Sequence, residues 1–241
     1  MPKLHVLLKK EELDGQLLPG KVVIVLDVLF ATTSIATALA HGATEVIPTL
    51  DGDAARAMAA GRPAGSFVLA GEFAAETLPG FAHPTPLALL DLSLSGRTLI
   101  YSTTNGTVAV RKAAGASRVY AAALGNGAAV VEHVVRRAQG ETVLLVCSGS
   151  VDAVNLEDFY GAGHLVSHFT RSGAGFELSD TALAAQILHD GSDALDCLSR
   201  SRVGRMMIER GLRREVAYAA RKDHLAVVPE LSGGRLVNAA A

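Results

Sequence analysis

Residues 22–33 read Val-Val-Ile-Val-Leu-Asp-Val-Leu-Phe-Ala-Thr-Thr, and this stretch decides the fold. The apolar and largely β-branched run from Val22 to Leu26 predicts a strand buried on both faces, because no polar residue alternates along it. A helical pattern from Thr33 to His41, closed by Gly42, predicts the helix that covers this strand. A strand, a polar loop and a helix in this order indicate an α/β protein with a mainly parallel sheet.

The same unit recurs along the first two thirds of the chain. Strands are predicted at 98–101, 118–123 and 143–146, followed by helices at 107–114, 128–138 and 156–169, with further short strands at 45–48 and 67–69. After Ser172 helical patterns dominate, at 180–188, 194–198 and 201–210, before a last extended piece at 225–228. We therefore expect one α/β unit over residues 1–241, with mainly parallel or mixed sheets and helices on the faces. The pattern leaves two α/β lobes, or a helix-rich C-terminal lobe at 173–241, open as alternatives.

The composition limits the classes of partner. Hydrophobic residues make up 49% of the chain and charged residues 19%, as in a well-packed globular protein. The formal charge of −2 favours neither nucleic acid nor an anionic membrane, so any anion must be held by a local site. The first residues have too short an apolar core for a signal peptide, and no run approaches the roughly 18 apolar residues of a membrane span. Cys147 and Cys197 form no CxxC pair, which favours a reducing, cytoplasmic location.

Polar side chains follow three of the predicted strands, at the point where each strand ends. Asp27 comes directly after the first strand, Ser102-Thr103-Thr104-Asn105-Gly106-Thr107 follows the strand at 98–101, and Cys147-Ser148-Gly149 ends the strand at 143–146. In parallel sheets ligands gather at this edge, beside the N-termini of helices. The three loops therefore predict one polar site for an anionic small molecule, although ordinary capped turns use the same residue types.

Three further carboxylates could belong to this site. Glu72 follows a short strand, and Glu157 and Asp158 lie in the first turn of a predicted helix, where acidic residues favour the helix dipole whatever their function. They are candidate oxygen ligands for a metal only if they face Asp27. Ser148 could act as a nucleophile, but no GxSxG motif surrounds it.

Two other patterns have simpler interpretations. His164 and His168 are spaced i to i+4, as in some zinc sites, but two surface histidines are favoured and zinc is not predicted. The basic run from Arg200 to Arg214 is most simply an amphipathic helix with a solvated face, from which an arginine could reach an anion at the site.

Together these positions resemble the 2-phosphosulfolactate phosphatase (ComB) family, Mg²⁺-dependent enzymes of coenzyme M biosynthesis. The matching segments span most of the chain: 25–29, 31–33, Gly71-Glu72, 102–107, Asn126, 147–149 and 156–158.

Three segments depart from the family pattern. Phe30 occupies the position of an arginine, and Phe73-Ala74-Ala75 stands where the family has Arg-Gly-Gly. Residues 82–86 replace a segment that reads Asp-x-Gly-Asn-Ser-Pro in the family. Because a guanidinium can fork onto a phosphate or sulfonate and a phenyl ring cannot, these changes alter the expected substrate contacts. The expected metal and hydroxyl groups are kept.

The resemblance implies a ComB-like fold and a Mg²⁺-dependent phosphatase that hydrolyses a small anionic phosphate monoester, similar to 2-phosphosulfolactate, to sulfolactate and phosphate. It implies Asp27, Glu72 and Asp158 as catalytic residues and, together with Glu157, as metal ligands. The substrate-binding residues that it implies are Thr32, Thr33, Ser102, Thr103, Thr104, Asn105, Gly106, Asn126 and Ser148.

Two competing interpretations differ in class. A degenerate family member would only bind a small anion, but three carboxylates contribute nothing to anion binding without a metal. A Rossmann oxidoreductase is excluded, because no GxGxxG motif follows a strand. The chain could also form a homodimer.

Overall fold

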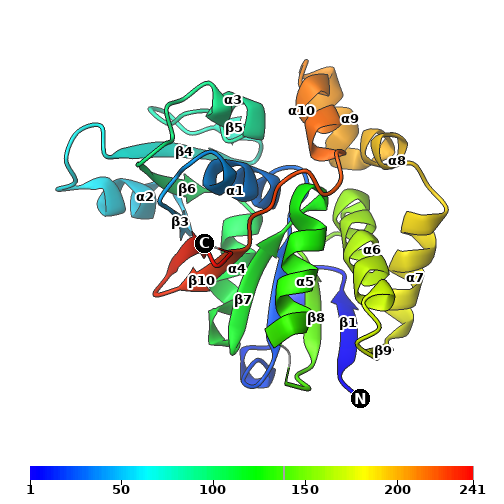
Figure 1. Cartoon of the computed structure of the whole chain (residues 1–241). Helices are drawn as coiled ribbons and strands as arrows, with labels where there is room; N and C mark the ends of the chain where they lie inside the picture. Colours follow the sequence, from blue (N-terminus) through cyan, green and yellow to red (C-terminus); the bar gives the residue numbers. More distant parts are fainter. Residues whose placement is uncertain (138, 241) are drawn as a thin grey trace.

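One mixed β-sheet covered by helices runs through the molecule (Figure 1), which confirms the predicted α/β fold class. The structure is a computed structural model that describes residues 1–137 and 139–240. Its strands are β1 (Lys3–Leu7), β2 (Val22–Leu26), β3 (Glu45–Thr49), β4 (Phe67–Phe73), β5 (Glu76–Thr77), β6 (Thr98–Ser102), β7 (Arg118–Ala122), β8 (Val143–Cys147), β9 (Glu177–Leu178), β10 (Pro229–Ser232) and β11 (Arg235–Asn238). They are ordered β5-β4-β6-β3-β11-β10-β7-β2-β8-β1-β9.

Helices cover this sheet. The α-helices are α1 (Ala31–Ala40), α2 (Gly52–Ala59), α3 (Pro86–Leu90), α4 (Gly106–Lys112), α5 (Gly127–Arg137), α6 (Leu156–Arg171), α7 (Asp180–Asp190), α8 (Ala194–Arg200), α9 (Arg202–Glu209) and α10 (Arg213–Ala219). Short 3₁₀ turns occur at η1 (Lys10–Glu12), η2 (Gly15–Leu17), η3 (Ala113–Gly115) and η4 (Leu124–Asn126). No helix in the described ranges is long and apolar enough to cross a membrane.

The sheet consists of two parallel sections joined by an antiparallel hairpin. β4, β6 and β3 run parallel in one section, and β7, β2, β8, β1 and β9 run parallel in the other. The β10–β11 hairpin lies between them and pairs antiparallel with β7 on one side and β3 on the other. Because each section is parallel, its carboxyl ends lie along one edge, where polar loops collect.

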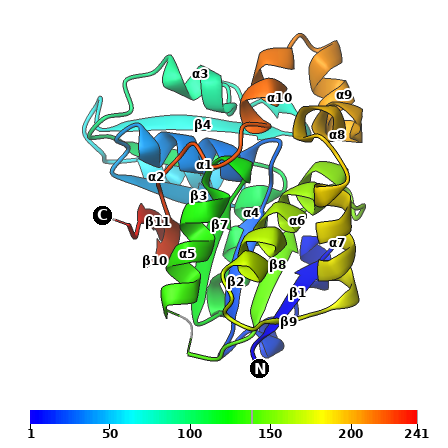
Figure 2. The ribbon, with the colours of Figure 1, turned by 45° about the vertical axis from the view of Figure 1, so that its right-hand side comes forward.

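The core follows the period-two alternation of the buried strands. Val23 and Val25 of β2 pack with residues of α1 and α4 on one face of the sheet. The alternating residues Val22, Ile24 and Leu26 pack on the other face, which α5, α6 and α7 cover (Figure 2). β2 is therefore buried on both faces, as its unbroken apolar sequence predicted.

The region after Ser172 contributes to both the sheet and its covering layers. β9, β10 and β11 join the sheet, and α7 packs against α6. Helices α8, α9 and α10 lie together at the start of α6 (Figure 1), where they share a small core with Val28 and Leu29 of the loop after β2. These three helices thereby cover the loop that carries Asp27.

Most predicted elements are confirmed within one or two residues, and two differences are informative. Residues 225–228 were expected to be extended, but they form no strand, because their backbone bonds run to the loop around η4: Leu225 N–H donates to Gly125 O, and Asn126 Nδ2 donates to Val227 O. The strand β10 begins instead at Pro229. α5 was predicted to end at Ala138, which lies outside the described residues.

A tight turn joins β4 to β5. Its two central residues, Ala74 and Ala75, have φ values of 52° and 63°, a left-handed conformation that favours glycine. This turn begins directly after Glu72 and Phe73 and borders the candidate site.

Candidate functional site

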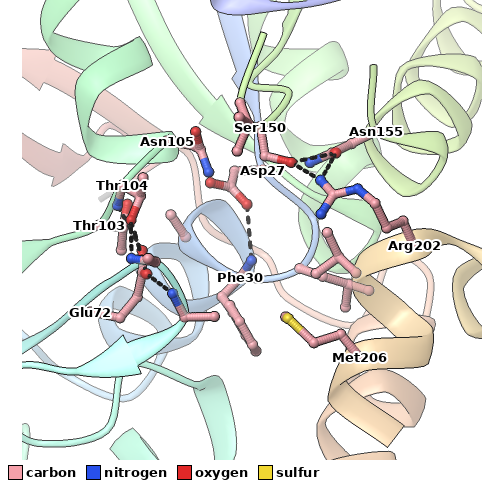
Figure 3. A pocket seen from close by; sticks show the side chains of 16 residues that line it. Asp27, Phe30, Glu72, Thr103, Thr104, Asn105, Ser150, Asn155, Arg202 and Met206 are labelled. Carbon is pink, nitrogen blue, oxygen red and sulfur yellow. Dashed lines mark hydrogen bonds between the residues drawn. The ribbon is translucent and has the colours of Figure 1, made fainter. Parts of the chain in front are cut away.

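A pocket of about 230 Å³ lies where the carboxyl ends of the two parallel sections meet, below the cap of α8, α9 and α10. Figure 3 shows Asp27 near its centre, Glu72 and Thr104 on one wall, and Arg202 and Asn155 on the opposite wall. The lining residues are Asp27, Leu29, Phe30, Ala31, Glu72, Ala74, Ala75, Thr103, Thr104, Asn105, Ser150, Val151, Asn155, Arg202, Val203 and Met206. The volume suits a compact ligand rather than a large cofactor.

Asp27 is fixed by the turn that leads from β2 into α1. Its Oδ1 accepts a hydrogen bond from the Phe30 N–H at 2.9 Å, and its backbone N–H donates to the Thr32 hydroxyl at 2.9 Å. The side chain is 7% exposed, and burial raises the pKa of Asp27 to about 6, with the neighbouring charge of Glu72 acting in the same direction. The pocket thus contains a carboxylate whose ionised form lacks full solvation.

Hydrogen bonds fix the carboxylate of Glu72 against the loop after β6 and the turn after β4. Its Oε1 accepts from the Thr104 N–H at 2.6 Å, and its Oε2 accepts from the Thr104 hydroxyl at 3.0 Å and the Ala75 N–H at 2.7 Å. The parallel pairing of Gly71 with Ser102 places the ends of β4 and β6 side by side, which brings these groups together. This carboxylate is therefore oriented before any ligand binds.

Asn105 and Gly106 place the start of α4 against Asp27. The side chains of Asn105 and Asp27 point toward each other (Figure 3), and Asn105 Oδ1 accepts from Lys10 Nζ at 2.9 Å. A Cβ on Gly106 would lie 2.5 Å from Asp27 Oδ2 and 2.4 Å from Ala31 Cβ. Only glycine permits this approach, and the sequence signal for it was the glycine at the end of the Ser-Thr-Thr-Asn-Gly segment.

Arg202 brings a positive charge to the wall opposite Glu72. Its guanidinium donates to Asn155 Oδ1 at 3.3 Å and to the Ser150 hydroxyl. The structure thus confirms that an arginine from the basic run reaches the site, but it divides this run among α8, α9 and α10 rather than forming one helix. Ser150 and Asn155 were not predicted, because neither stands at a strand end within a recognisable motif.

Several predicted substrate-binding residues lie outside the pocket lining. The hydroxyls of Thr32 and Thr33 donate to the carbonyls of Asp27 and Val28, which caps the start of α1. Asn126 is buried and bonds to Ala123 N–H and Val227 O. Their polar groups are therefore occupied by the protein backbone.

Ser102 and Ser148 also lie beside the pocket rather than in its lining. Ser102 lines a neighbouring cavity that shares Glu72, Thr103 and Thr104 with the pocket. Ser148 is fully buried, and its Oγ has no hydrogen-bond partner among the described residues. Neither hydroxyl is placed for direct contact with a ligand in the pocket.

Glu157 and Asp158 lie beneath the pocket at the start of α6. Both side chains are buried, and neither lines the pocket. Asp158 accepts from the Val28 N–H at 2.8 Å and the Gly149 N–H at 3.2 Å, so it ties the loop after β2 to the loop after β8. The structure gives Asp158 this positioning contact, while Asp27 and Glu72 are the predicted carboxylates that line the pocket.

Glu157 differs from Asp158 because its two carboxylate oxygens are buried without a hydrogen-bond partner in the described part of the chain. Burial raises the pKa of Glu157 to about 7, and the charge of Asp27 adds to this effect. The folded protein therefore binds a proton at Glu157 more tightly than the unfolded chain, in which this pKa is 4.5. The resulting stabilisation is complete below pH 4.5 and is lost as the pH rises through about 7.

Glu157→Gln should therefore raise the free energy of unfolding by about 3 kcal/mol at pH 8 without divalent cations, and leave it nearly unchanged at pH 4. Urea unfolding at both pH values measures this difference. Glu132→Gln, at an exposed residue paired with Arg136, is the matched control and should show no such pH dependence. If the free energy of unfolding depended on pH equally in Glu157→Gln and the wild type, the raised pKa of Glu157 would be refuted.

The four predicted metal ligands do not form one compact cluster. Within residues 1–137 and 139–240, the one group of three or more potential ligand side chains with ligand atoms within 4.8 Å of one another is His164, His168 and Asp223. His164 is 2% exposed, so the expectation of two surface histidines was wrong for this residue. Its burial results from the packing of α6 beneath α7, which the spacing alone did not reveal.

The fold and the pocket define an α/β protein with a carboxylate- and hydroxyl-lined site for a small ligand at the carboxyl edge of parallel strands. A family model described as 2-phosphosulpholactate phosphatase matches residues 7–234. The chain belongs to the 2-phosphosulfolactate phosphatase family.

Individual relatives match over nearly their whole length. A protein of Symbiobacterium thermophilum is 37% identical over 224 residues, which cover 91% of this chain and 95% of the relative. A protein of Carboxydothermus hydrogenoformans is 37% identical over 98% of this chain and 96% of its own length. A protein of Deinococcus radiodurans is 35% identical over 91% of each chain. Each carries the name "Probable 2-phosphosulfolactate phosphatase".

Proposed function

We propose that this protein is a Mg²⁺-dependent phosphoric monoester hydrolase that converts a small anionic substrate such as 2-phosphosulfolactate to sulfolactate and phosphate. The observation that carries the proposal is the pairing of Asp27 and Glu72 with Arg202 in one pocket. A site that only bound an anion would be weakened by two carboxylates, whereas a phosphatase can use them to hold a cation beside the phosphate. The names of the relatives support the substrate class.

The residues of the pocket fit Mg²⁺ in the chemistry of their donors. Mg²⁺ prefers oxygen ligands and commonly keeps several waters while binding one or two carboxylates. Asp27 and Glu72 would supply these carboxylates, and Glu157 and Asp158 lie buried beneath them at the start of α6. When bound, the ion would neutralise phosphoryl oxygens and lower the pKa of a coordinated water.

The hydroxyl and amide groups of the loop after β6 have a separate role in this proposal. Thr103, Thr104 and Asn105 line the pocket next to the first turn of α4, where backbone N–H groups favour anionic oxygens. Thr104 already donates its N–H and its hydroxyl to Glu72, so the loop is held in place before binding. We assign Thr104 to positioning Glu72, and Asn105 with the N–H groups at the start of α4 to orienting the phosphate.

Arg202 would hold the second anionic group of the substrate. Phe30 lines the pocket at the position where the family pattern has arginine, and with Met206 it forms an apolar side (Figure 3). The guanidinium of Arg202 lies on the opposite wall from Glu72, so it could bind a sulfonate or carboxylate while the phosphate lies near Asp27. In this arrangement the guanidinium comes from α9 instead of from the residue just before α1.

The test is release of inorganic phosphate from 2-phosphosulfolactate by the purified chain, with Mg²⁺ and with chelator. Arg202→Ala should lower kcat/KM by about 10- to 100-fold, mainly through KM, because it removes a charge-assisted hydrogen bond to the substrate. Arg205→Ala, a change on the same helix outside the pocket lining, should leave kcat/KM unchanged. Ligand binding without phosphate release would instead support the anion-binding alternative.

A further inference from the structure

A second polar cluster lies on α6, away from the pocket. His164 Nε2 is 3.0 Å from Asp223 Oδ1, and His168 Nε2 is 3.0 Å from Asp223 Oδ2. None of the three residues lines the pocket. Glu157 and Asp158 lie in the first turn of α6, and the two histidines follow about 10 to 15 Å further along its axis.

A network of buried contacts surrounds His164. His189 Nδ1 lies 2.8 Å from Asp190 Oδ1, which can only accept, so His189 donates there and its Nε2 is an acceptor. Lys222 Nζ donates to the single lone pair of that Nε2 at 3.0 Å. His164 Nδ1 lies 3.3 Å from the same Nε2, and its other nitrogen, Nε2, faces Asp223.

Both histidines present Nε2 to the same carboxylate. A neutral His164 donates from Nε2 to Asp223 Oδ1 at 3.0 Å. The ring is 2% exposed, so an added charge could not be solvated by water. One ligand atom from each of the three side chains lies within 4.8 Å of the other two, so a metal ion that replaced the Nε2 protons would find its ligands gathered.

We propose that His164, His168 and Asp223 form a zinc site, separate from the phosphatase pocket, that fastens the end of the helical cap to α6. Two imidazoles and one carboxylate are a zinc donor set, and bonds of 2.0 to 2.1 Å at tetrahedral angles separate ligand atoms by about 3.3 Å. The distances of 3.0 Å from His164 Nε2 to Asp223 Oδ1 and from His168 Nε2 to Asp223 Oδ2 lie close to this value, so each carboxylate oxygen faces one imidazole. Nitrogen ligands disfavour Mg²⁺, so the two sites would take different metals.

The surroundings fit this assignment. Asp223 Oδ1 also accepts from the Ala128 N–H at 2.8 Å, which fixes the carboxylate against the start of α5. The side chains of His168 and Asp223 are 20% and 31% exposed, which leaves room for water as a fourth ligand. Arg171 lies 3.4 Å from His168 Nδ1, and this exposed contact would yield when the metal displaces the proton from Nε2.

The site would connect distant parts of the chain. Asp223 lies four residues after the end of α10, and α10 belongs to the cap that covers the pocket. A bound zinc ion would hold the segment after α10 to the middle of α6, beyond the start of α6 over which the cap lies in Figure 1. The expected consequence is a more stable cap rather than a second reaction.

The test uses the untagged full-length chain, stripped of metal and titrated with Zn²⁺ in millimolar Mg²⁺. We expect one Zn²⁺ per chain, a rise of about 5 to 10 °C in the unfolding midpoint at saturation, and visible absorption from Co²⁺ that Zn²⁺ displaces. His168→Ala should weaken Zn²⁺ binding by more than about a hundredfold. His41→Ala, at the exposed histidine that follows α1, should bind Zn²⁺ as the wild type does.

Two results would overturn the site. One is the absence of Zn²⁺ uptake and of the Co²⁺ spectrum in the wild type at micromolar metal, which would make the cluster a protonated ion pair. The other is equal uptake by His168→Ala and His41→Ala. If His168→Ala fails to fold, the Co²⁺ spectrum of the wild type still shows whether the site binds a metal. Phosphatase activity is not the readout, so failure here leaves the proposed function untouched.

Discussion

Asp27→Asn is expected to lower kcat/KM for hydrolysis of 2-phosphosulfolactate by at least about a thousandfold. Asp27 is the one carboxylate at the centre of the pocket, with Glu72 on the adjacent wall and the N-terminus of α4 beside it. The amide can still accept the Phe30 N–H, so the turn after β2 should persist. The variant therefore removes the charge that would hold a cation while keeping the local structure.

Steady-state phosphate release over a Mg²⁺ series measures the effect, with circular dichroism and thermal unfolding to verify the fold. Asp193→Asn is the matched control, because Asp193 also accepts a backbone N–H at the start of a helix but lies outside the pocket lining. It should retain full activity. Activity of Asp27→Asn within tenfold of the wild type, or wild-type activity that chelator does not change, would rule out the metal mechanism.

Gly106→Ala should impair both stability and activity. The added methyl group would lie 2.4 Å from Ala31 Cβ and 2.5 Å from Asp27 Oδ2, closer than any real contact, so α4 or the Asp27 loop must move. We expect the free energy of unfolding to fall by about 2 kcal/mol and kcat/KM to fall by about a hundredfold, because Asp27 and the Thr103–Asn105 loop lose their alignment.

Gly115→Ala provides the control for this change. Its added Cβ would meet only Leu18 Cδ1 at 3.9 Å and Gly15 O at 4.0 Å, so the methyl group fits without displacement. Urea unfolding and phosphate release should both match the wild type within error. A Gly106→Ala protein with normal activity would show that the close approach of α4 to Asp27 does not matter for function.

The sequence could predict those site residues whose positions follow from the ends of the parallel strands. Asp27 directly follows β2, Glu72 lies near the end of β4, and Thr104 lies two residues after β6, and parallel pairing brings such positions to one edge. Glu157 and Asp158 were predicted as ligands from the resemblance, but both are buried beneath the pocket, where Asp158 accepts backbone N–H groups and Glu157 has no partner among the described residues. Adjacency in sequence does not specify the direction in which a helical side chain points.

The remaining residues depend on contacts between distant segments. Arg202 reaches the pocket because α8, α9 and α10 pack on Val28 and Leu29, a tertiary contact without a sequence signature. The pairing of His164 with Asp223 joins residues 59 positions apart. Such contacts arise from how the covering helices pack, and periodicity along the chain cannot reveal them.

The turn at Ala74 and Ala75 implies a trade between stability and activity. An alanine in the left-handed region costs about 1 kcal/mol relative to glycine, so two in succession store strain beside the pocket. The Ala75 N–H binds Glu72 and the Ala74 N–H binds Thr104, so the strained backbone sets the direction of the carboxylate. Selection for thermostability alone would favour glycines here, and the freer backbone would hold Glu72 less firmly.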